Sequence, residues 1–306
     1  MFEERIEIIG IDHGWSNIKT ANHVFISGVK EMSTEPALQD NLIKYQNTYY
    51  KIGTSRMEVK DTKVVDESYY ILTLAALAKE LKMRGKTRAK VVMGVGLPLT
   101  RFGAEKRDFI DYLSRQKEVH FKFEGEHFNI RMEKVMIYPQ CYGAVVDKIG
   151  NFNNNLVIVD IGSWTIDIMP VINQIPDEAN CKTIPRGLIT CIREINDEMV
   201  RVMNGEIPEN MIEEVMRYGT VTIGKPYLDI MTRKLTEFAE RIYNTLKELG
   251  FNSNVSQVVF VGGGASVMKH FGRMEGENIS FIEDVRANAK GYEYLTKMSM
   301  RGKAGL

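Results

Sequence analysis

Apolar residues in the first half of the chain follow two different periods. A run rich in isoleucine at residues 6–12 and shorter runs after it predict a β-meander, whereas residues 68–84 have the period of a buried helix. On that helix Lys79, Glu80 and Lys82 are expected to face outward, and Gly85 is expected to cap its end. The strands predicted in this half lie at residues 6–12, 18–21, 23–26, 49–53, 91–95, 119–123, 128–132 and 135–138. The predicted helices lie at residues 68–84, 105–115 and 140–149.

A polar stretch at residues 151–155 separates this half from a second one, which also begins with an apolar strand that ends in an aspartate. The strands predicted there lie at residues 156–160, 166–172 and 255–261, and the helices at 187–204, 226–249 and 284–298. Strands that alternate with helices predict an α/β fold. We therefore expect two domains, at residues 1–150 and 156–283, and the length of 306 residues favours the same division.

One short pattern occurs at the head of each half. It consists of a strand, an aspartate, one residue, a glycine, four residues and a charged residue. The first copy is Asp12, His13, Gly14, Trp15, Ser16, Asn17, Ile18 and Lys19, and the second is Asp160, Ile161, Gly162, Ser163, Trp164, Thr165, Ile166 and Asp167. Because the pattern is duplicated, we expect one site between the halves that uses both copies.

The residue types of these loops suit the binding of phosphate. A glycine lets the backbone approach a ligand closely, and consecutive N–H groups of a turn can bind an anion. Side-chain donors are added by Ser16, Asn17, Ser163 and Thr165, and a positive charge is added by Lys19. The alternative is an ordinary hairpin, because Asp and Gly are common in turns of every kind.

The aspartates of the two loops predict a metal ion as well. Asp12, Asp160 and Asp167 would repel a bare triphosphate. Mg²⁺ keeps several waters and usually takes one or two carboxylates besides phosphate oxygens. We therefore expect Asp12 and Asp160 to hold Mg²⁺ through water.

A third element is an apolar strand that runs into Gly262, Gly263, Gly264 and Ala265. Three glycines permit a backbone to approach a flat or anionic ligand, although they also suit a tight connection between a strand and a helix. The run is not a GxGxxG pattern and no Walker lysine follows it. Neither a Rossmann site nor a P-loop is indicated.

Composition narrows the classes of function. Lys and Arg together number 40, as do Asp and Glu, so the net charge is zero, which argues against a broad nucleic-acid-binding surface and permits self-association. The three cysteines have no zinc or redox spacing and suit a reducing cytoplasm. No apolar run reaches the roughly 20 residues that cross a bilayer, and the start lacks a signal-peptide pattern. We expect a cytoplasmic protein without membrane contact.

The two loops and the glycine run, in this order, resemble the nucleotide-binding elements of the actin, sugar kinase and heat-shock-chaperone superfamily. Residues 12–19 look like its phosphate-1 loop, residues 160–167 like its phosphate-2 loop and residues 258–266 like its adenosine motif. Residues 138–144 and 288–295 sit where its two interdomain helices belong. Within the superfamily, the stretch GLPL at residues 96–99 and the short chain are similar to the plasmid-segregation actins of the ParM/StbA group.

The resemblance implies an actin-like fold of two duplicated, ribonuclease H-like domains, with the nucleotide in the interdomain cleft and helix 284–298 packed back near the first domain. It implies a bound nucleotide, ATP or alternatively GTP, together with Mg²⁺. In the reaction, Asp12 and Asp160 would organise the metal ion and the phosphates. Gln140 would lie near the attacking water, which a neutral glutamine can orient although it is a poor base.

The resemblance also implies roles in nucleotide binding. Gly262, Gly263 and Gly264 would lie behind the nucleotide, and Arg186 and Gly187 would approach the ribose or the phosphates. Trp15 and Trp164 depart from the family's small turn residues, and we expect both rings to pack on a neighbouring domain surface. His13 is expected to be exposed to solvent rather than catalytic.

The leading hypothesis is an ATPase that forms nucleotide-dependent filaments for the segregation of plasmid DNA. Its implied partners are further copies of the chain, joined head to tail, and a DNA-bound adaptor of the ParR type, so direct contact with nucleic acid is not expected. Two alternatives stay open. One is a monomeric phosphotransferase similar to sugar kinases, for which no catalytic base can be assigned, and the other is a scaffold that binds nucleotide without hydrolysing it.

Overall fold

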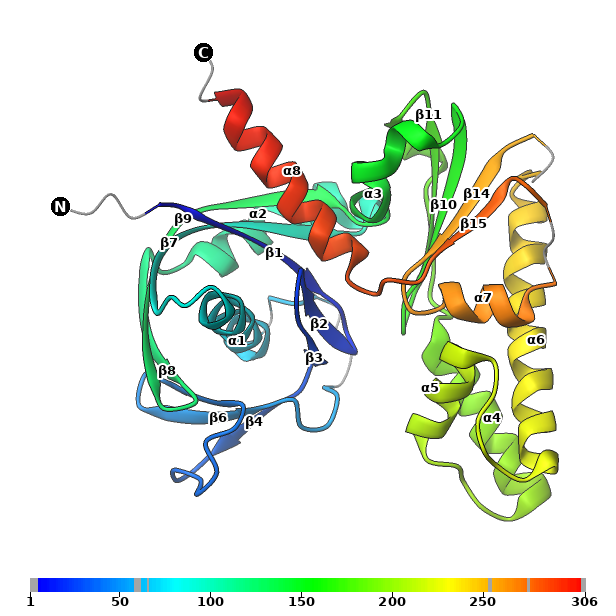
Figure 1. Cartoon of the computed structure of the whole chain (residues 1–306), viewed down its shortest axis with the longest axis horizontal. Coiled ribbons are helices and arrows are strands. Elements are labelled where there is room, and N and C mark those ends of the chain that lie inside the picture. The colour runs from blue at the N-terminus through cyan, green and yellow to red at the C-terminus, as the bar shows by residue number, and fades with distance from the viewer. Residues whose placement is uncertain (1–4, 58–61, 65, 253–254, 274–275, 304–306) are drawn as a thin grey trace. The chain divides into compact units, whose positions relative to one another are not determined.

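The structure is a computed structural model that describes residues 5–57, 62–64, 66–252, 255–273 and 276–303 (Figure 1). The chain divides into two compact units, one made of Met1–Asp147 with Arg286–Leu306 and the other of Lys148–Val285. Strands and helices alternate in both units, which confirms the predicted α/β class. In the part of the chain that the structure describes, no helix has both the length and the apolar character needed to span a bilayer.

The first unit is built on one long sheet, in which nine strands of the described residues are joined in the order β3-β2-β1-β7-β9-β8-β5-β6-β4. The strands are β1 (Glu7–His13), β2 (Asn17–Thr20), β3 (Val24–Ile26), β4 (Val29–Met32), β5 (Leu42–Tyr45), β6 (Thr48–Ile52), β7 (Arg88–Leu97), β8 (Glu118–Phe123) and β9 (Glu126–Pro139). The helices are α1 (Ser68–Met83), α2 (Leu99–Ser114), α3 (Tyr142–Val145) and α8 (Ala287–Lys303). A 3₁₀-helix, η1 (Val146–Asn151), follows α3 and contains the point of the chain at which the first unit ends and the second begins. Figure 1 shows that the sheet curls around α1.

Because α1 lies inside this curl, polar residues such as Thr73 are buried along it together with the apolar ones, whereas Lys82 near its end is exposed. Glu80 is fully buried, so the expectation that it faces outward is wrong. Its carboxylate accepts hydrogen bonds from Thr20 Oγ1 (2.6 Å) and the backbone N–H of Asn22 (3.0 Å). Arg84 pairs with this carboxylate and with Glu7 and Glu293, which ties α1 to β1 and α8.

Parallel pairing brings three strand ends to one edge of the sheet. β7 pairs with β1 on one side and with β9 on the other, both in parallel. The carboxyl ends of β1 and β9 therefore carry Asp12 and the residues next to Gln140 to the same edge. β1 also forms an antiparallel hairpin with β2, in which Asp12 lies opposite Lys19. The first candidate loop is the turn of this hairpin.

The second unit contains a smaller sheet, in which six strands of the described residues are joined in the order β12-β11-β10-β14-β15, with β13 paired to β11. The strands are β10 (Asn155–Ile161), β11 (Ile166–Ile172), β12 (Ile175–Pro176), β13 (Lys182–Ile184), β14 (Gln257–Val261) and β15 (Ile279–Ile282). The helices are α4 (Leu188–Met203), α5 (Glu209–Tyr218), α6 (Lys225–Glu248) and α7 (Ala265–Phe271), with a 3₁₀-helix, η2, at Glu178–Asn180. The second candidate loop joins β10 to β11.

Some elements differ from the sequence-based expectation. The strands predicted at residues 128–132 and 135–138 are one strand, β9, because the polar residue Glu133 between them sits at a register shift opposite Val91 and Val92. The helix predicted at residues 140–149 is the single turn of α3 followed by η1. β4, β5, β12, β13, β15 and α5 were not predicted.

Candidate functional site

The first loop holds a buried and ionised carboxylate. Asp12 is 2% exposed, and its Oδ2 accepts an ion-paired hydrogen bond from Lys19 Nζ at 2.9 Å. Its Oδ1 lies 3.4 Å from Nε2 of Gln140. Burial alone would raise the pKa of Asp12, but the positive charges of Lys19 and Lys63 outweigh it and hold this pKa below its ordinary value.

Hydrogen bonds fix the shape of the turn between β1 and β2. The carbonyl oxygen of Gly14 accepts from Ser27 Oγ (2.7 Å) and from the hydroxyl of Tyr69 (3.3 Å). A Cβ at Gly14 would lie 2.5 Å from the carbonyl oxygen of Asn17, so the turn needs glycine there. Ser16 is buried, and no described residue offers its Oγ a hydrogen-bond partner.

The aromatic residues beside this turn pack within their own unit. The ring of Trp15 meets that of Tyr69 edge to face, with centroids 5.6 Å apart. Trp15 therefore packs on α1 of its own unit. His13 is fully buried and shares a hydrogen bond of 2.8 Å with Thr73 Oγ1, so its predicted exposure is wrong. Its place on β1 directs the ring toward α1, and burial together with the charge of Lys63 lowers its pKa to about 3.

Lys63 is a residue of this site that the sequence did not indicate. Its side chain is 9% exposed, and Nζ lies 5.6 Å from the ring centroid of Trp15 and 5.9 Å from that of Tyr69. Burial lowers the pKa of Lys63 to about 8, although the charge of Asp12 favours the protonated form. No predicted element covers this stretch of the chain, and an isolated lysine in a polar stretch carries no sequence signal.

Gln140 is held by its backbone on both sides. Its N–H donates to the carbonyl oxygen of Leu97 on β7 (2.9 Å), and its own carbonyl oxygen accepts from the N–H of Tyr142 (2.7 Å). The second bond closes a γ-turn at Cys141, whose φ of 65° and ψ of −60° are strained for a residue with a side chain. The amide of Gln140 is thereby fixed beside Asp12.

The second loop has a different internal arrangement. The N–H of Gly162 donates to the carbonyl oxygen of Thr165 (2.9 Å), which closes the turn. Asp167 accepts hydrogen bonds from Thr165 Oγ1 (3.0 Å) and from Thr183 Oγ1 (2.6 Å) on β13. The carboxylate of Asp167 thus orients the side chain of Thr165. The contribution of Thr183 becomes visible only when β13 is paired with β11.

The first residues of α4 hold the backbone of this loop. Gly187, Leu188 and Ile189 donate their N–H groups to the carbonyl oxygens of Trp164 (3.0 Å), Gly162 (3.1 Å) and Ser163 (2.8 Å), in that order. These bonds satisfy donors that a helix start leaves without intrahelical partners. A trans peptide points its C=O and its N–H in opposite directions. The N–H groups of residues 163–165 therefore point away from α4, in the arrangement of an anion-binding nest.

Trp164 packs onto the same helix. The guanidinium carbon of Arg193 lies 5.3 Å from the centroid of its ring, within the range of a cation–π contact. The ring therefore lies against α4 of its own unit. The N–H groups of the turn keep their common direction with this large residue in place.

The glycine run lies directly beside the end of β10. β14 pairs with β10 in parallel and brings Val261 opposite Asp160. A Cβ at Gly262, whose φ is +81°, would overlap Oδ1 of Asp160, and one at Gly264 would overlap the side chain of Ile161. The run is therefore packed against the strand that carries the second loop. Ala265 begins α7 and is fully buried.

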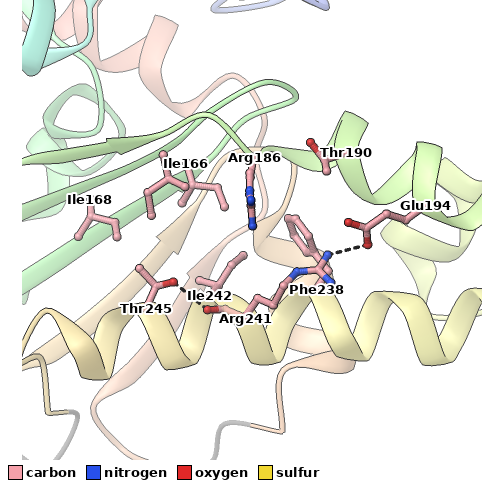
Figure 2. A pocket seen from close by; sticks show the side chains of 10 residues that line it. Ile166, Ile168, Arg186, Thr190, Glu194, Phe238, Arg241, Ile242 and Thr245 are labelled. Atoms are coloured by element: carbon pink, nitrogen blue, oxygen red, sulfur yellow. Dashed lines mark hydrogen bonds and ion pairs between the residues drawn. The ribbon is translucent and has the colours of Figure 1, made fainter.

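Arg186 differs from the other predicted residues of the second unit. Figure 2 shows its side chain pointing from the end of β13 toward α6, into a cavity on the face of the sheet that α4 and α6 cover. Its neighbour Gly187 lies against the second loop, because a Cβ there would lie 2.6 Å from the carbonyl oxygens of Gly162 and Ser163. The structure thus forms two groups of the predicted residues, one in each unit, and places the side chain of Arg186 in the cavity.

The donor set fits a hydrated Mg²⁺ better than a metal cage. Among the described residues there is no cluster of three or more His, Cys, Asp or Glu that could enclose an ion. The carboxylate of Asp12 is ionised and hydrogen-bonded to Lys19 and lies near Gln140. A site with one or two carboxylates suits Mg²⁺ that keeps its waters and binds phosphate oxygens.

Family models match both halves of the chain. Residues 10–143 match the model for the N-terminal domain of actin-like proteins. Residues 158–272 match the model for the C-terminal part of the archaeal actin homologue, MreB-like. A search of curated protein sequences finds no match. The two models together cover most of the chain, and each contains one of the two loops.

Solved structures of actin homologues have the same fold. The archaeal actin homologue Ta0583 is 19% identical, with a TM-score of 0.79 over 96% of this chain and 99% of its own, and it has also been solved in complex with ADP. The apo ParM protein of psk41 is 17% identical, with a TM-score of 0.74 over 98% and 99% of the two chains. A ParM of Clostridium botulinum, solved as a 15-stranded filament, is 19% identical, with a TM-score of 0.75 over 95% and 99%. The actin-like fold predicted from the loops is confirmed.

Proposed function

Because this chain belongs to the actin-like proteins, matched by their family models in both halves, we propose that it binds and hydrolyses ATP and assembles into filaments. The observation that carries the proposal is the second loop, whose three successive N–H groups all point away from α4. Oriented backbone donors of this kind bind phosphate oxygens. The ADP complex of Ta0583, which has the same fold, supports a nucleotide as the ligand.

Each of the two loops supplies groups that bind the phosphates of the nucleotide. Lys19 and the N–H groups of residues 163–165 bind phosphate oxygens, and Ser163 and Thr165 add hydroxyl groups. Asp12 and Asp160 would hold a hydrated Mg²⁺, which would lower the charge on the phosphates. Gly262, Gly263 and Gly264 lie behind the nucleotide, where their lack of side chains permits close approach.

Hydrolysis depends on the orientation of one water. Gln140 is fixed by its backbone on both sides and lies beside the ionised Asp12. Its amide positions the water for in-line attack on the terminal phosphorus, and Lys19 stabilises the charge on the phosphate oxygens. No covalent intermediate on the protein is needed, since phosphoryl transfer is catalysed mainly by positioning and by electrostatics.

The expected assembly is a head-to-tail filament that ATP favours and hydrolysis weakens. Head-to-tail contacts whose rotation does not close into a ring extend into open helical filaments. The filament of the Clostridium botulinum ParM, which shares the fold, supports this part of the proposal. We further propose that the filament segregates plasmid DNA through a DNA-bound adaptor of the ParR type, in the cytoplasm.

The test measures phosphate release and light scattering with ATP, with GTP and without nucleotide, in the presence of Mg²⁺. Wild-type protein should hydrolyse ATP and scatter light only with nucleotide. Gln140→Ala should bind ATP with unchanged affinity, polymerise and release phosphate at least about tenfold more slowly, because positioning of the water is lost. Lys19→Ala should weaken ATP binding, and Lys30→Ala on β4 is its control.

ATP binding without phosphate release in the wild-type protein would identify a nucleotide-binding scaffold instead. ATP turnover only in the presence of an added hydroxyl compound would identify a phosphotransferase.

A further inference from the structure

A cavity of about 200 Å³ lies in the second unit, between the sheet and the helices α4 and α6 (Figure 2). Its walls include the apolar side chains of Ile166, Ile168, Ile184, Phe238 and Ile242. An apolar cavity of about 150 Å³ is enough to hold benzene. This cavity therefore has room for an aromatic ring with a short chain.

The charged side chains at the rim of the cavity favour a ligand that carries a carboxylate. Arg241 is paired with Glu194 at 2.8 Å, so these two charges offset each other. Arg186 is exposed, points into the cavity, and has no ion pair with any residue that the structure describes. An arginine with unused donors suits a carboxylate, which it can bind with two parallel hydrogen bonds. Thr190, in the first turn of α4, adds a hydroxyl to the same rim.

The cavity shares its walls with the second loop. Ile166 follows Thr165 directly, and Arg186 precedes Gly187, whose N–H donates to Trp164. Arg193, on the same helix as Thr190, packs on the ring of Trp164. A molecule that displaces Arg186 or the first turn of α4 must therefore shift the contacts of the loop.

We propose that this cavity binds a small amphipathic carboxylate, with its apolar body among the isoleucines and its carboxylate on Arg186, and that the bound acid changes the environment of Trp164. The site is separate from the proposed phosphate site. Its occupation alters the phosphate-binding loop through Ile166, Arg186 and the first turn of α4, and this part of the inference rests on the proposed function.

The probe for the test is 3-phenylpropionate, which matches the cavity in size, compared with 3-phenylpropanol and 3-phenylpropylamine. Calorimetric titration without nucleotide should show the acid binding about tenfold or more tightly than the alcohol, because a hydrogen bond to a charged group is lost, and no binding of the amine. Equal affinities for acid and alcohol would overturn the role of Arg186. Absence of binding by all three compounds, or binding only of an acidic peptide, would overturn the proposal of a small-molecule site.

Two pairs of variants locate the site. Thr245→Phe fills the cavity from α6 and should abolish binding, whereas Asn244→Phe, on an exposed position of the same helix outside the cavity, should not. Arg186→Gln should remove the preference for acid over alcohol, whereas Arg201→Gln, near the other end of α4, should keep it. Circular dichroism verifies folding, and Thr190→Phe fills the cavity from the opposite wall if Thr245→Phe fails to fold. Retained binding in a folded, filled variant would refute the site.

The effect on the loop is read from fluorescence. The chain has two tryptophans, so in Trp15→Phe the emission comes from Trp164 alone. Saturating 3-phenylpropionate should change this emission in Trp15→Phe and leave it unchanged when Thr245→Phe is added. This readout needs neither nucleotide nor turnover, so it separates failure of the cavity site from failure of the proposed ATPase. Binding of the acid without any change in emission would disprove the coupling.

Discussion

Gly291 of α8 lies against the backbone of Gly143 in α3 so closely that no side chain fits between them. A Cβ at Gly291 would overlap the carbonyl oxygen of Gly143, and one at Gly143 would press on the ring of Tyr292. This contact fixes α3, which follows Gln140 and Cys141 directly. The position of the candidate catalytic glutamine therefore depends on the packing of a helix from the far end of the chain.

Gly291→Ala should destabilise the protein by about 2–3 kcal/mol, because the added methyl group has no room and the helices must separate. Gly103→Ala is the matched control, since a Cβ at Gly103 in α2 meets no described atom within 4 Å. That substitution should stabilise by up to about 1 kcal/mol through helix propensity. Urea denaturation of both variants measures the change in the free energy of unfolding. An equal change in the two variants would contradict the close contact between Gly291 and Gly143.

Gly262→Ala and Gly250→Ala separate backbone strain from contact with Asp160. Both glycines have a φ of +81°, but only Gly262 has the carboxylate of Asp160 in the path of a Cβ. Each alanine should cost about 1–2 kcal/mol for the left-handed backbone. Gly262→Ala should add about 1–3 kcal/mol for the overlap and should also weaken ATP binding. ATP affinity that is equal in the two variants would argue against a nucleotide site at Asp160.

Glu80→Gln should change the acid sensitivity of folding. Burial favours the protonated form of Glu80, but hydrogen bonds from Thr20 and Asn22 outweigh it and hold its pKa below 4.5. The folded state therefore gains stability from this carboxylate above the unfolded pKa and loses it as the pH falls through the lower folded value.

At pH 7 the substitution should cost about 1.5–3 kcal/mol, the usual loss for hydrogen bonds to a charged group. This cost should shrink as the pH falls below 4.5 and through the lower folded pKa. Denaturation curves at several pH values measure it, with Glu240→Gln at an exposed position of α6 as the control. A cost that is independent of pH would show that the pKa of Glu80 is the same in the folded and the unfolded protein.

Cys141→Gly and Cys141→Ala test the strained γ-turn. Glycine adopts a positive φ without steric cost, whereas alanine does not. The free energy of unfolding should therefore be about 1 kcal/mol higher for the glycine variant than for the alanine variant. Its ATP turnover should fall, because a freer backbone holds Gln140 less firmly. Equal ATP turnover in Cys141→Gly and Cys141→Ala would show that the strained turn does not contribute to catalysis.

The fold was largely predictable because its decisive strands are strongly apolar and each ends in an aspartate. β1 and β10 were placed within a residue by this signal. β4, with the sequence VKEM, has two charged residues in four and gives no such signal. The sequence of α5 did contain a signal for a helix, since Ile212, Val215 and Met216 have the spacing of one helix face.

The candidate site was predictable only where local sequence determines it. The two turns follow from their glycines, but the burial of His13 follows from the curl of the sheet around α1, which no local pattern describes. Lys63 and Thr183 reach the loops through tertiary contacts with Trp15 and Asp167. Long-range packing decides such positions, so the residues that support a loop are harder to infer than the loop itself.

The three hydrogen bonds between α4 and the second loop have a mechanical consequence. α4 has 16 residues, so at 1.5 Å per residue it is about 24 Å long. A helix bonded to a loop at its first turn moves with that loop as one body, and a small tilt at one end becomes a larger displacement at the other. The release of a phosphate at residues 163–165 would thus be converted into movement at Met203, far from the chemistry.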